Sequence, residues 1–317
     1  MKKSSAQPGI PAAAAPGGAG RNPRRAGCPL RPLVRAALPA AVLLLGGCGG
    51  PAARERPAAA VPPFTAADAT NAYRQTERFV ALGPRAAGTA GARRAAEYLR
   101  ETLLALGAPG VRIESFDDDT PAGRRAFHNV LAEFPAARAG APRIVLLSHF
   151  DTKTGVPGDS PATPFIGAND SGSSTGLLLA LAARFAAAPA PLPCHVLFAF
   201  LDGEECAVAY SDRDGLHGSK HLARGLRAQG VPVRAVILAD MIGDRDLKLQ
   251  IPRNSTPGLR LLALDCADRL GLRDHVTLVN GTILDDHQPF LDAGFAAVVL
   301  IDFAFGSAPG LNDYWHT

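Results

Sequence analysis

A pair of glutamates after an apolar stretch is the first candidate for chemistry in this sequence. The run Val196–Leu201 is apolar throughout, which predicts a strand buried on both faces, and Asp202-Gly203-Glu204-Glu205 follows it directly. In open α/β sheets, ligands bind beyond the carboxyl ends of the strands. Two adjacent glutamates there could divide the work, one binding a metal ion and the other moving protons. An isolated Glu-Glu pair is more often a solvated loop, so catalysis requires partners elsewhere.

Residues that bind metals recur at the ends of other expected segments. They are His149 and Asp151, Asp170, Asp240, the run Asp285-Asp286-His287, and His316. Each residue alone has an ordinary explanation: His149 as a hydrogen-bonded core residue, Asp170 as a helix N-cap, Asp240 as the polar end of a buried strand. Their recurrence at successive strand ends favours a metal site. Imidazole nitrogen and carboxylate oxygen together suit zinc, and a catalytic zinc keeps one position open.

The elements that must position these residues alternate along the chain. Helical periodicity and end signals predict helices over Ala67–Leu82, Gly91–Leu106, Thr175–Ala188, Ser219–Ala228, Leu259–Leu270 and Gln288–Ala293. Strands are predicted over Val111–Phe116, Phe127–Phe134, Ile144–His149, Val196–Leu201, Ala235–Asp240, Val276–Val279 and Ala297–Ile301. The first two strands, with turn residues near Pro121 between them, predict an antiparallel edge. The pattern as a whole predicts an α/β fold, a three-layer sandwich with a central mixed, mostly parallel twisted sheet and helices on both faces.

Charge is distributed unevenly along the 317 residues. The formal net charge is +4, but residues 1–47 carry seven Lys or Arg and no acid, so removing them leaves −3. A mildly acidic body argues against a nucleic-acid partner. The apolar content of 47% is ample for a packed core.

The N-terminal region has the layout of an export signal. Basic residues precede the apolar stretch Ala36–Leu45, which is shorter than the ~20 residues needed to span a bilayer. Leu45-Gly46-Gly47-Cys48 resembles a bacterial lipoprotein cleavage box, which implies lipidation of Cys48. We therefore expect a signal peptide over residues 1–47, a Pro/Ala-rich tether over 48–65 and a catalytic domain over 66–317. The expected product is an exported monomer, anchored through Cys48 in the bacterial cell envelope, at the periplasm or outer membrane.

Three cysteines follow Cys48. Cys194 and Cys206 bracket the central strand, and about 12 positions at ~3.3 Å each separate them far beyond the ~7 Å limit for a disulfide. No bridge between them is expected.

Six short motifs occur in order between residue 148 and the C-terminus. They are Ser148-His149-Phe150-Asp151-Thr152-Lys153, Gly167-Ala168-Asn169-Asp170-Ser171, Phe200-Leu201-Asp202-Gly203-Glu204-Glu205, Leu216-His217-Gly218-Ser219-Lys220-His221-Leu222-Ala223, Asp285-Asp286-His287-Gln288-Pro289-Phe290-Leu291 and Tyr314-Trp315-His316-Thr317. Together they resemble the glutaminyl cyclases (glutaminyl-peptide cyclotransferases), members of the zinc aminopeptidase-like superfamily. The resemblance extends from about Ala67 to the end of the chain.

The resemblance implies a role for each matching residue. It makes Asp170, Glu205 and His316 the ligands of one zinc ion, and Glu204 the proton shuttle. The carboxylates of Asp240 and Asp285 would form hydrogen bonds around Glu204, and Trp315 would be a wall of the substrate pocket. His149, with Asp240, matches the position of a second zinc in related aminopeptidases, and Asp151 would orient His149. Tyr210 stands where animal cyclases have a pocket-lining tryptophan, so it is expected to line the substrate site.

The implied reaction suits these residue types. Peptides or proteins with an N-terminal glutamine would be the substrates, and their own α-amino group would attack the γ-carbonyl, polarised by zinc. Glu204 would take the amine proton and return it to the departing ammonia, leaving a pyroglutamyl peptide.

Two departures from the family accompany the resemblance. Ser148 and Thr175 occupy positions that form a disulfide in secreted animal enzymes. The sequence also stops after Thr317, where relatives continue into a helix. A truncation there would leave His316 on a frayed end and weaken zinc binding.

Three other functions remain open at this level. A two-zinc aminopeptidase would use the same side chains, with Asp170 bridging two metals and Glu204 activating water. Gly172-Ser173-Ser174-Thr175-Gly176 formally fits the G-x-S-x-G pattern of serine hydrolases, although no strand runs into it. A binding lipoprotein without catalytic metal is the non-enzyme alternative. Asp285 before Asp286-His287 and Trp315 before His316 favour the cyclase.

Overall fold

A computed structural model describes residues 64–188, 191–304 and 315–316. The expected signal peptide, Cys48 and all but the last two residues of the tether lie outside the described residues. Within the described part of the chain, no helix is both long and apolar enough to cross a bilayer.

The helices form where periodicity predicts them, to within one or two residues at most ends. Those described are α1 (Ala66–Val80), α2 (Ala90–Ala105), α3 (Ser174–Ala186), α4 (His217–Ala228), α5 (Pro257–Arg269) and α6 (His287–Asp292), with short helical segments at η1 (Ala168–Ser173) and η2 (Arg273–His275). The N-cap of α1 is Thr65, and Asp68 lies three residues later in the first turn. Their side chains make a reciprocal capping box, because Asp68 returns a hydrogen bond to the amide of Thr65.

Eight strands of the described chain join in one mixed sheet. They are β1 (Arg112–Thr120), β2 (Gly123–Phe134), β3 (Arg143–His149), β4 (His195–Leu201), β5 (Val233–Asp240), β6 (Leu249–Ile251), β7 (Val276–Leu278) and β8 (Ala297–Ile301), in the spatial order β1-β2-β4-β3-β5-β8-β6-β7. The neighbours β4, β3, β5 and β8 run parallel, while β1–β2, β2–β4 and β6–β8 are antiparallel. The predicted α/β fold is confirmed; the short strand β6 was not predicted.

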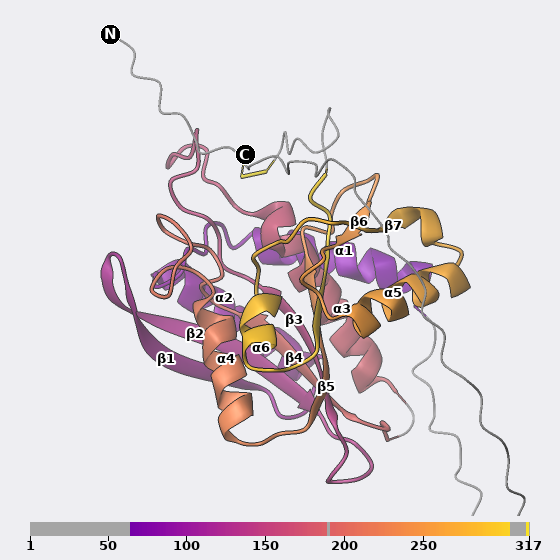
Figure 1. The fold of residues 1–317 in the computed structure, drawn as a ribbon. Coiled ribbons are helices and arrows are strands. Elements are labelled where there is room, and N and C mark those ends of the chain that lie inside the picture. The colour runs from indigo at the N-terminus through magenta and orange to yellow at the C-terminus, as the bar shows by residue number, and fades with distance from the viewer. Residues whose placement is uncertain (1–63, 189–190, 305–314, 317) are drawn as a thin grey trace, which may run out of the picture. The chain divides into compact units, whose positions relative to one another are not determined.

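The apolar run of β4 is buried on both faces of the sheet. Val196, Phe198 and Phe200 pack with residues of α1, α2 and α3, whereas the intervening side chains of β4 pack with α4 and α6. Complete burial of a leucine or phenylalanine side chain contributes roughly 1.5–3 kcal/mol, so this strand stabilises both layers at once. Figure 1 shows the helices distributed over the two faces of the sheet, with α5 beside the strands at its far edge.

The edge hairpin is longer than its apolar residues indicate. β1 and β2 pair from Arg112–Leu131 to Thr120–Gly123, leaving only residues 121–122 as the turn. The added segments are polar and partly exposed. Arg124 lies 3.7 Å from a carboxylate oxygen of Asp117 and 3.7 Å from one of Asp119. Apolar alternation cannot reveal such strands, because cross-strand charge pairs rather than core contacts accompany their pairing.

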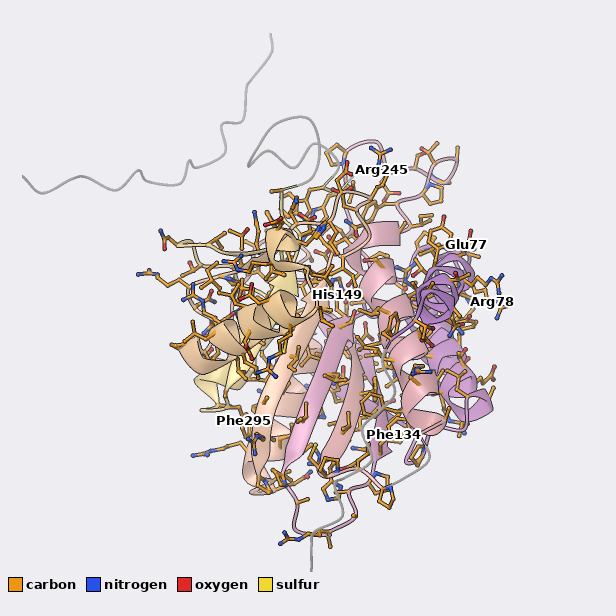
Figure 2. All side chains as sticks on the ribbon, turned by 90° about the vertical axis from the view of Figure 1, so that its right-hand side faces the viewer. Glu77, Arg78, Phe134, His149, Arg245 and Phe295 are labelled. Carbon is orange, nitrogen blue, oxygen red and sulfur yellow. The ribbon has the colours of Figure 1, made fainter. Side chains whose placement is uncertain are left out.

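The carboxyl ends of β3, β4 and β5 meet at one edge of the sheet. In register, His149 pairs with Leu201, and Leu147 with Leu238. Figure 2 shows His149 at the end of the sheet opposite Phe134 and Phe295. Parallel pairing therefore brings together the polar residues that follow three strands distant in sequence.

The three described cysteines are free. Cys194 and Cys206 lie before and after β4, and Cys266 lies on α5. The expected absence of a bridge between Cys194 and Cys206 is confirmed.

Candidate metal centre

His149 ends β3 with its imidazole between carboxylates. Its Nδ1 is 3.4 Å from Oδ1 of Asp151, and its Nε2 is 3.1 Å from Oδ1 of Asp170 and 3.4 Å from Oδ1 of Asp240. The ring is fully buried. Burial by itself lowers the pKa of His149, but Asp240 and the other two carboxylates raise it well above its usual value.

Asp170 lies between two histidines. Its Oδ1 is near Nε2 of His149, as given above, and its Oδ2 is 3.2 Å from Nε2 of His316. The residue belongs to η1 but has the non-helical angles φ −103° and ψ 94°, so it is not the N-cap of α3. Burial acts to raise the pKa of Asp170, and the adjacent imidazoles of His149 and His316 outweigh that effect and lower the pKa.

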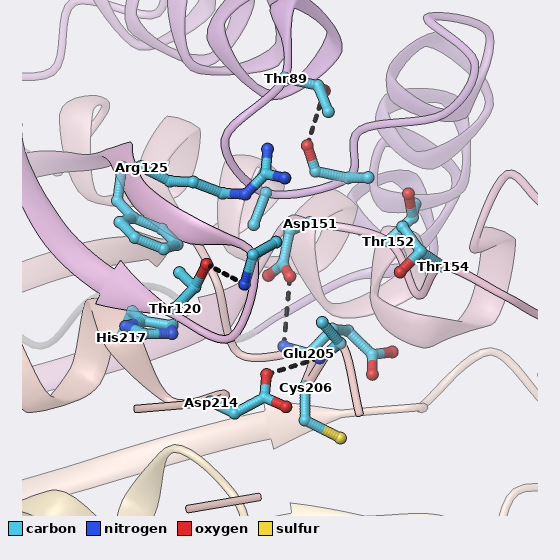
Figure 3. A pocket seen from close by; sticks show the side chains of 15 residues that line it. Thr89, Thr120, Arg125, Asp151, Thr152, Thr154, Glu205, Cys206, Asp214 and His217 are labelled. Carbon is cyan, nitrogen blue, oxygen red and sulfur yellow. Dashed lines mark hydrogen bonds between the residues drawn. The ribbon is translucent and has the colours of Figure 1, made fainter. Parts of the chain in front are cut away.

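The two glutamates after β4 are held by Asp151. The amide of Glu204 donates to Oδ1 of Asp151 (3.0 Å), and the amide of Glu205 donates to Oδ2 (3.2 Å), the contact drawn in Figure 3. Glu205 Oε1 is 3.2 Å from Nε2 of His316, and Oε2 is 3.1 Å from Nζ of Lys153. Asp151 thus fixes the backbone of both glutamates, while their side chains meet different partners.

His316 completes this group from the far end of the sequence. Its φ of +54° is in the left-handed region, uncommon for a residue with a side chain and frequent at functional sites. The imidazole stacks on the indole of Trp315 with centroids 4.1 Å apart, and the ring of Phe165 approaches it edge-on at 6.0 Å. Trp315 remains 44% exposed, which leaves a wall for a ligand.

Asp240 and Asp285 line the same buried region in different ways. Oδ1 of Asp240 accepts hydrogen bonds from the hydroxyl of Ser171 (2.7 Å) and the amide of Met241 (2.8 Å). Oδ2 of Asp285 is buried without a hydrogen-bond partner among the described residues. Within this part of the chain, the hydrogen bond to the Glu204 carboxylate comes from Tyr210 (2.9 Å), rather than from the expected Asp240 or Asp285.

The region concentrates negative charge away from water. Its buried carboxyl groups are Asp151, Asp170, Glu204, Glu205, Asp240, Asp285 and Asp286. Burial, together with the charges of neighbouring carboxylates and against the opposing effect of His149, raises the pKa of Glu204 and Asp285 well above the usual range. The carboxylates around His316 outweigh its burial and raise its pKa to about 9. A dication would relieve this mutual repulsion.

Two groups of donors have the proximity that a metal ion requires. Atoms of Asp170, Glu205 and His316 all lie within 4.8 Å of one another, and so do atoms of His149, Asp170 and Asp240. Mixed nitrogen and oxygen donors suit zinc, and both ring nitrogens of His149 are buried without a hydrogen-bond partner among the described residues. The residues present therefore fit a zinc ion.

The sequence did not predict a role for three residues that support the centre. Arg85 is fully buried, and its guanidinium donates to the carbonyls of Gly83, Phe150, Ile166 and Gly167. Ser171 contacts Asp240, and Lys153 contacts Glu205, as described above. Lys153 and Ser171 lie inside recognised motifs, which was the available signal, whereas an arginine after a Gly-Pro turn has no sequence signature of burial.

One hollow borders the centre, and a second borders Tyr210. A cavity of about 160 Å³ reaches Asp151 and Glu205 from the side of the β1–β2 hairpin, with Arg125 and Thr89 also on its wall (Figure 3). A wider hollow of about 610 Å³ is lined by Tyr210 and by residues of α4 and α6. Tyr210 thus borders open space.

The serine-hydrolase pattern lacks the required context. Ser174 is fully buried in the first turn of α3, and Ser173 donates to the carbonyl of Asn169 (2.7 Å). Neither hydroxyl has a histidine among its hydrogen-bond partners in the described chain. The Ser-His arrangement that activates a serine nucleophile is therefore missing there.

Comparison with known proteins gives consistent results. The model of "Peptidase family M28" matches residues 129–317. A "glutaminyl-peptide cyclotransferase-like protein" of Bos taurus is 32% identical over 260 residues, covering 74% of this chain and 65% of the relative. The corresponding Mus musculus protein is 30% identical and is covered over 64% of its length. The chain thus spans slightly less than two thirds of these two relatives.

Solved structures share the fold. The glutaminyl cyclase of an Acidobacteriales bacterium superposes with a TM-score of 0.68 at 31% identity, over 80% of this chain and 85% of that one. A Zn-dependent exopeptidase from Parabacteroides distasonis superposes with a TM-score of 0.69 at 25% identity, over 81% and 91%. Both chemistries that the sequence left open thus occur on this fold.

Proposed function

Because the chain belongs to peptidase family M28, we propose that it is a zinc-dependent glutaminyl-peptide cyclotransferase, which converts an N-terminal glutamine into pyroglutamate and releases ammonia. The observation that carries this proposal is the convergence of Asp170, Glu205 and His316, with the buried Glu204 directly before Glu205 in the chain. The names of the relatives, given above, support the choice of reaction.

Asp170, Glu205 and His316 would hold the zinc ion. The bound ion would act as a Lewis acid toward the γ-carbonyl of the substrate glutamine. The ammonium group of Lys153 forms an ion pair with Oε2 of Glu205, and Asp151 fixes the Glu205 backbone. The Glu205 carboxylate is therefore oriented before a metal ion binds. Trp315, stacked on His316, offers a flat exposed wall for the substrate.

Glu204 would move the proton. Its raised pKa allows the carboxylate to accept a proton from the substrate's α-amino group and to return it to the departing nitrogen. The amine attacks the γ-carbonyl of its own residue, so the carbon–nitrogen bond of the ring forms as the bond to ammonia breaks. Because the reaction is intramolecular, positioning replaces much of the activation otherwise required.

A two-zinc aminopeptidase is the second candidate, favoured by the group His149, Asp170 and Asp240. Two hydrogen bonds argue against it. Ser171 and the amide of Met241 already donate to the Asp240 oxygen that is nearest to His149. A second zinc on that oxygen would compete with these two hydrogen bonds, and we therefore favour a single zinc.

The testing experiment measures ammonia release from a Gln-initiated peptide, with and without chelator, alongside cleavage of a leucine anilide. We expect the chelator to abolish ammonia release and Glu204→Gln to lower it, and we expect the anilide to stay intact. A matched control is Glu77→Gln on the exposed face of α1. Anilide cleavage with two zinc ions per chain would instead establish the peptidase.

We also propose that the protein is exported and anchored by a lipid on Cys48. Support comes from the basic and apolar leader followed by Leu45-Gly46-Gly47-Cys48. Metabolic labelling with a fatty-acid analogue should tag the wild type and not Cys48→Ala. Equal labelling of both proteins would refute the anchor.

A further inference from the structure

Tyr210 reaches into the centre from the loop between β4 and α4. Its hydroxyl donates a 2.9 Å hydrogen bond to Oε1 of Glu204, six residues earlier. The contact joins a phenol to the carboxyl group assigned to proton transfer, which distinguishes Tyr210 from a passive wall of the pocket.

The ring of Tyr210 is held in place by a glycine. Gly215 has φ +78°, and a Cβ there would lie 2.5 Å from Cδ1 of the Tyr210 ring. No other residue type could occupy position 215 without displacing that ring or straining the backbone. Nζ of Lys153 lies over the same ring, 5.8 Å from its centroid.

The backbone leading to Tyr210 is also fixed. The carboxylate of Asp214 accepts hydrogen bonds from the amides of Ala207 (2.6 Å), Val208 (2.8 Å) and Ala209 (3.0 Å). Ser211 and Asp214 exchange backbone hydrogen bonds as well, at 2.9 and 3.3 Å. A loop tied at this many points presents the phenol in a defined position.

We propose that Tyr210 is a positioning residue for proton transfer: its hydroxyl holds Oε1 of Glu204 and presents Oε2 to the substrate's amino group. This inference rests on the proposed function. Burial and the charge of Glu204 raise the pKa of Tyr210, so the phenol keeps its proton and remains a donor. A side chain with the same ring and no hydroxyl would preserve the wall and lose the hydrogen bond.

The first test compares steady-state kinetics of ammonia release in the wild type, Tyr210→Phe, Glu204→Gln and the double variant. Tyr210→Phe should lower kcat roughly 10- to 100-fold, the range for losing a hydrogen bond to a charged group, with KM nearly unchanged. It should add little in the Glu204→Gln background. Tyr73→Phe, exposed on α1, is the control. Unchanged kcat, or a change confined to KM, would overturn the proposal.

A second measurement does not depend on turnover. The urea midpoints of the wild type, Tyr210→Phe, Glu204→Met and the double variant, all measured on zinc-loaded protein, form a double-mutant cycle. Because both single changes break the same hydrogen bond, the double variant should be less destabilised than the sum of the two. Additive effects of the two changes on the free energy of unfolding would contradict the hydrogen bond between Tyr210 and Glu204. A wild type that releases no ammonia but shows this coupling would refute the cyclase function and leave the hydrogen bond standing.

Discussion

The carboxylate of Asp151 accepts a hydrogen bond from the backbone amide of Glu204 at 3.0 Å. Asp151 follows β3 and Glu204 follows the parallel neighbour β4, so this contact links two strand ends. The same carboxyl group accepts from the amide of Glu205 and lies 3.4 Å from Nδ1 of His149. One buried side chain therefore contacts the residue proposed for proton transfer (Glu204), a proposed zinc ligand (Glu205) and His149.

Replacing Asp151 with asparagine should weaken the centre. Asparagine keeps one acceptor and places an amide group, itself a donor, against a backbone amide or the imidazole. Groups that orient metal ligands are typically worth about 10- to 100-fold in metal affinity or activity, and we expect a loss in that range. Chelator competition and ammonia release measure it. Asp246→Asn, on an exposed ion pair, is the control, and wild-type zinc affinity in Asp151→Asn would contradict the role assigned to Asp151.

Arg85 is expected to stabilise the loop that carries Asp170. Its guanidinium donates to Ile166 and Gly167, directly before η1, and to Phe150 after β3. In Arg85→Met, buried carbonyls would lose their donors, at a cost of about 1–3 kcal/mol each. Thermal unfolding should therefore shift several degrees lower, with weaker zinc binding. Arg78→Met, at the exposed site labelled in Figure 2, should leave both unchanged. Equal unfolding temperatures for the two variants would rule out this function of Arg85.

The parts predictable from sequence were those marked by apolar periodicity or by short motifs. The run Val196–Leu201 identified β4 and hence the edge where Glu204 and Glu205 lie. The polar ends of the β1–β2 hairpin were not predicted, because their pairing leaves no apolar pattern in the sequence. The contacts of Arg85 and Tyr210 escaped because they depend on how loops distant from one another pack, which local spacing does not encode.

Zinc stoichiometry should respond to Ser171. Its hydroxyl donates to Oδ1 of Asp240, the oxygen 3.4 Å from Nε2 of His149. We expect one tightly bound zinc per wild-type chain, and a second, weaker one in Ser171→Ala, where that oxygen has lost a donor. Equilibrium dialysis with elemental analysis counts the ions. Ser115→Ala on β1 should behave as wild type, and two tight zinc ions in the wild type would exclude the single-zinc account.

Stability should fall in mild acid because of His287. Burial lowers the pKa of this imidazole to about 4 from its usual value of 6.5, and Nε2 lies 3.1 Å from Nδ2 of Asn254. Between these two pH values the unfolded chain binds more protons at this residue than the folded chain, so unfolding becomes easier as pH falls from 6.5 toward 4. The apo-protein variant His287→Gln should show a flatter pH dependence of the urea midpoint over this range. His275→Gln, on the surface, should keep the wild-type slope. An unchanged slope in His287→Gln would contradict this origin of acid sensitivity.

The most direct test of the account is anomalous X-ray scattering at the zinc edge from crystals of the zinc-loaded protein. We predict a peak about 2.0–2.2 Å from carboxylate oxygens of Asp170 and Glu205 and from Nε2 of His316, the usual zinc–ligand distances. A zinc peak elsewhere, with these three side chains pointing away from it, would contradict the assignment of this centre.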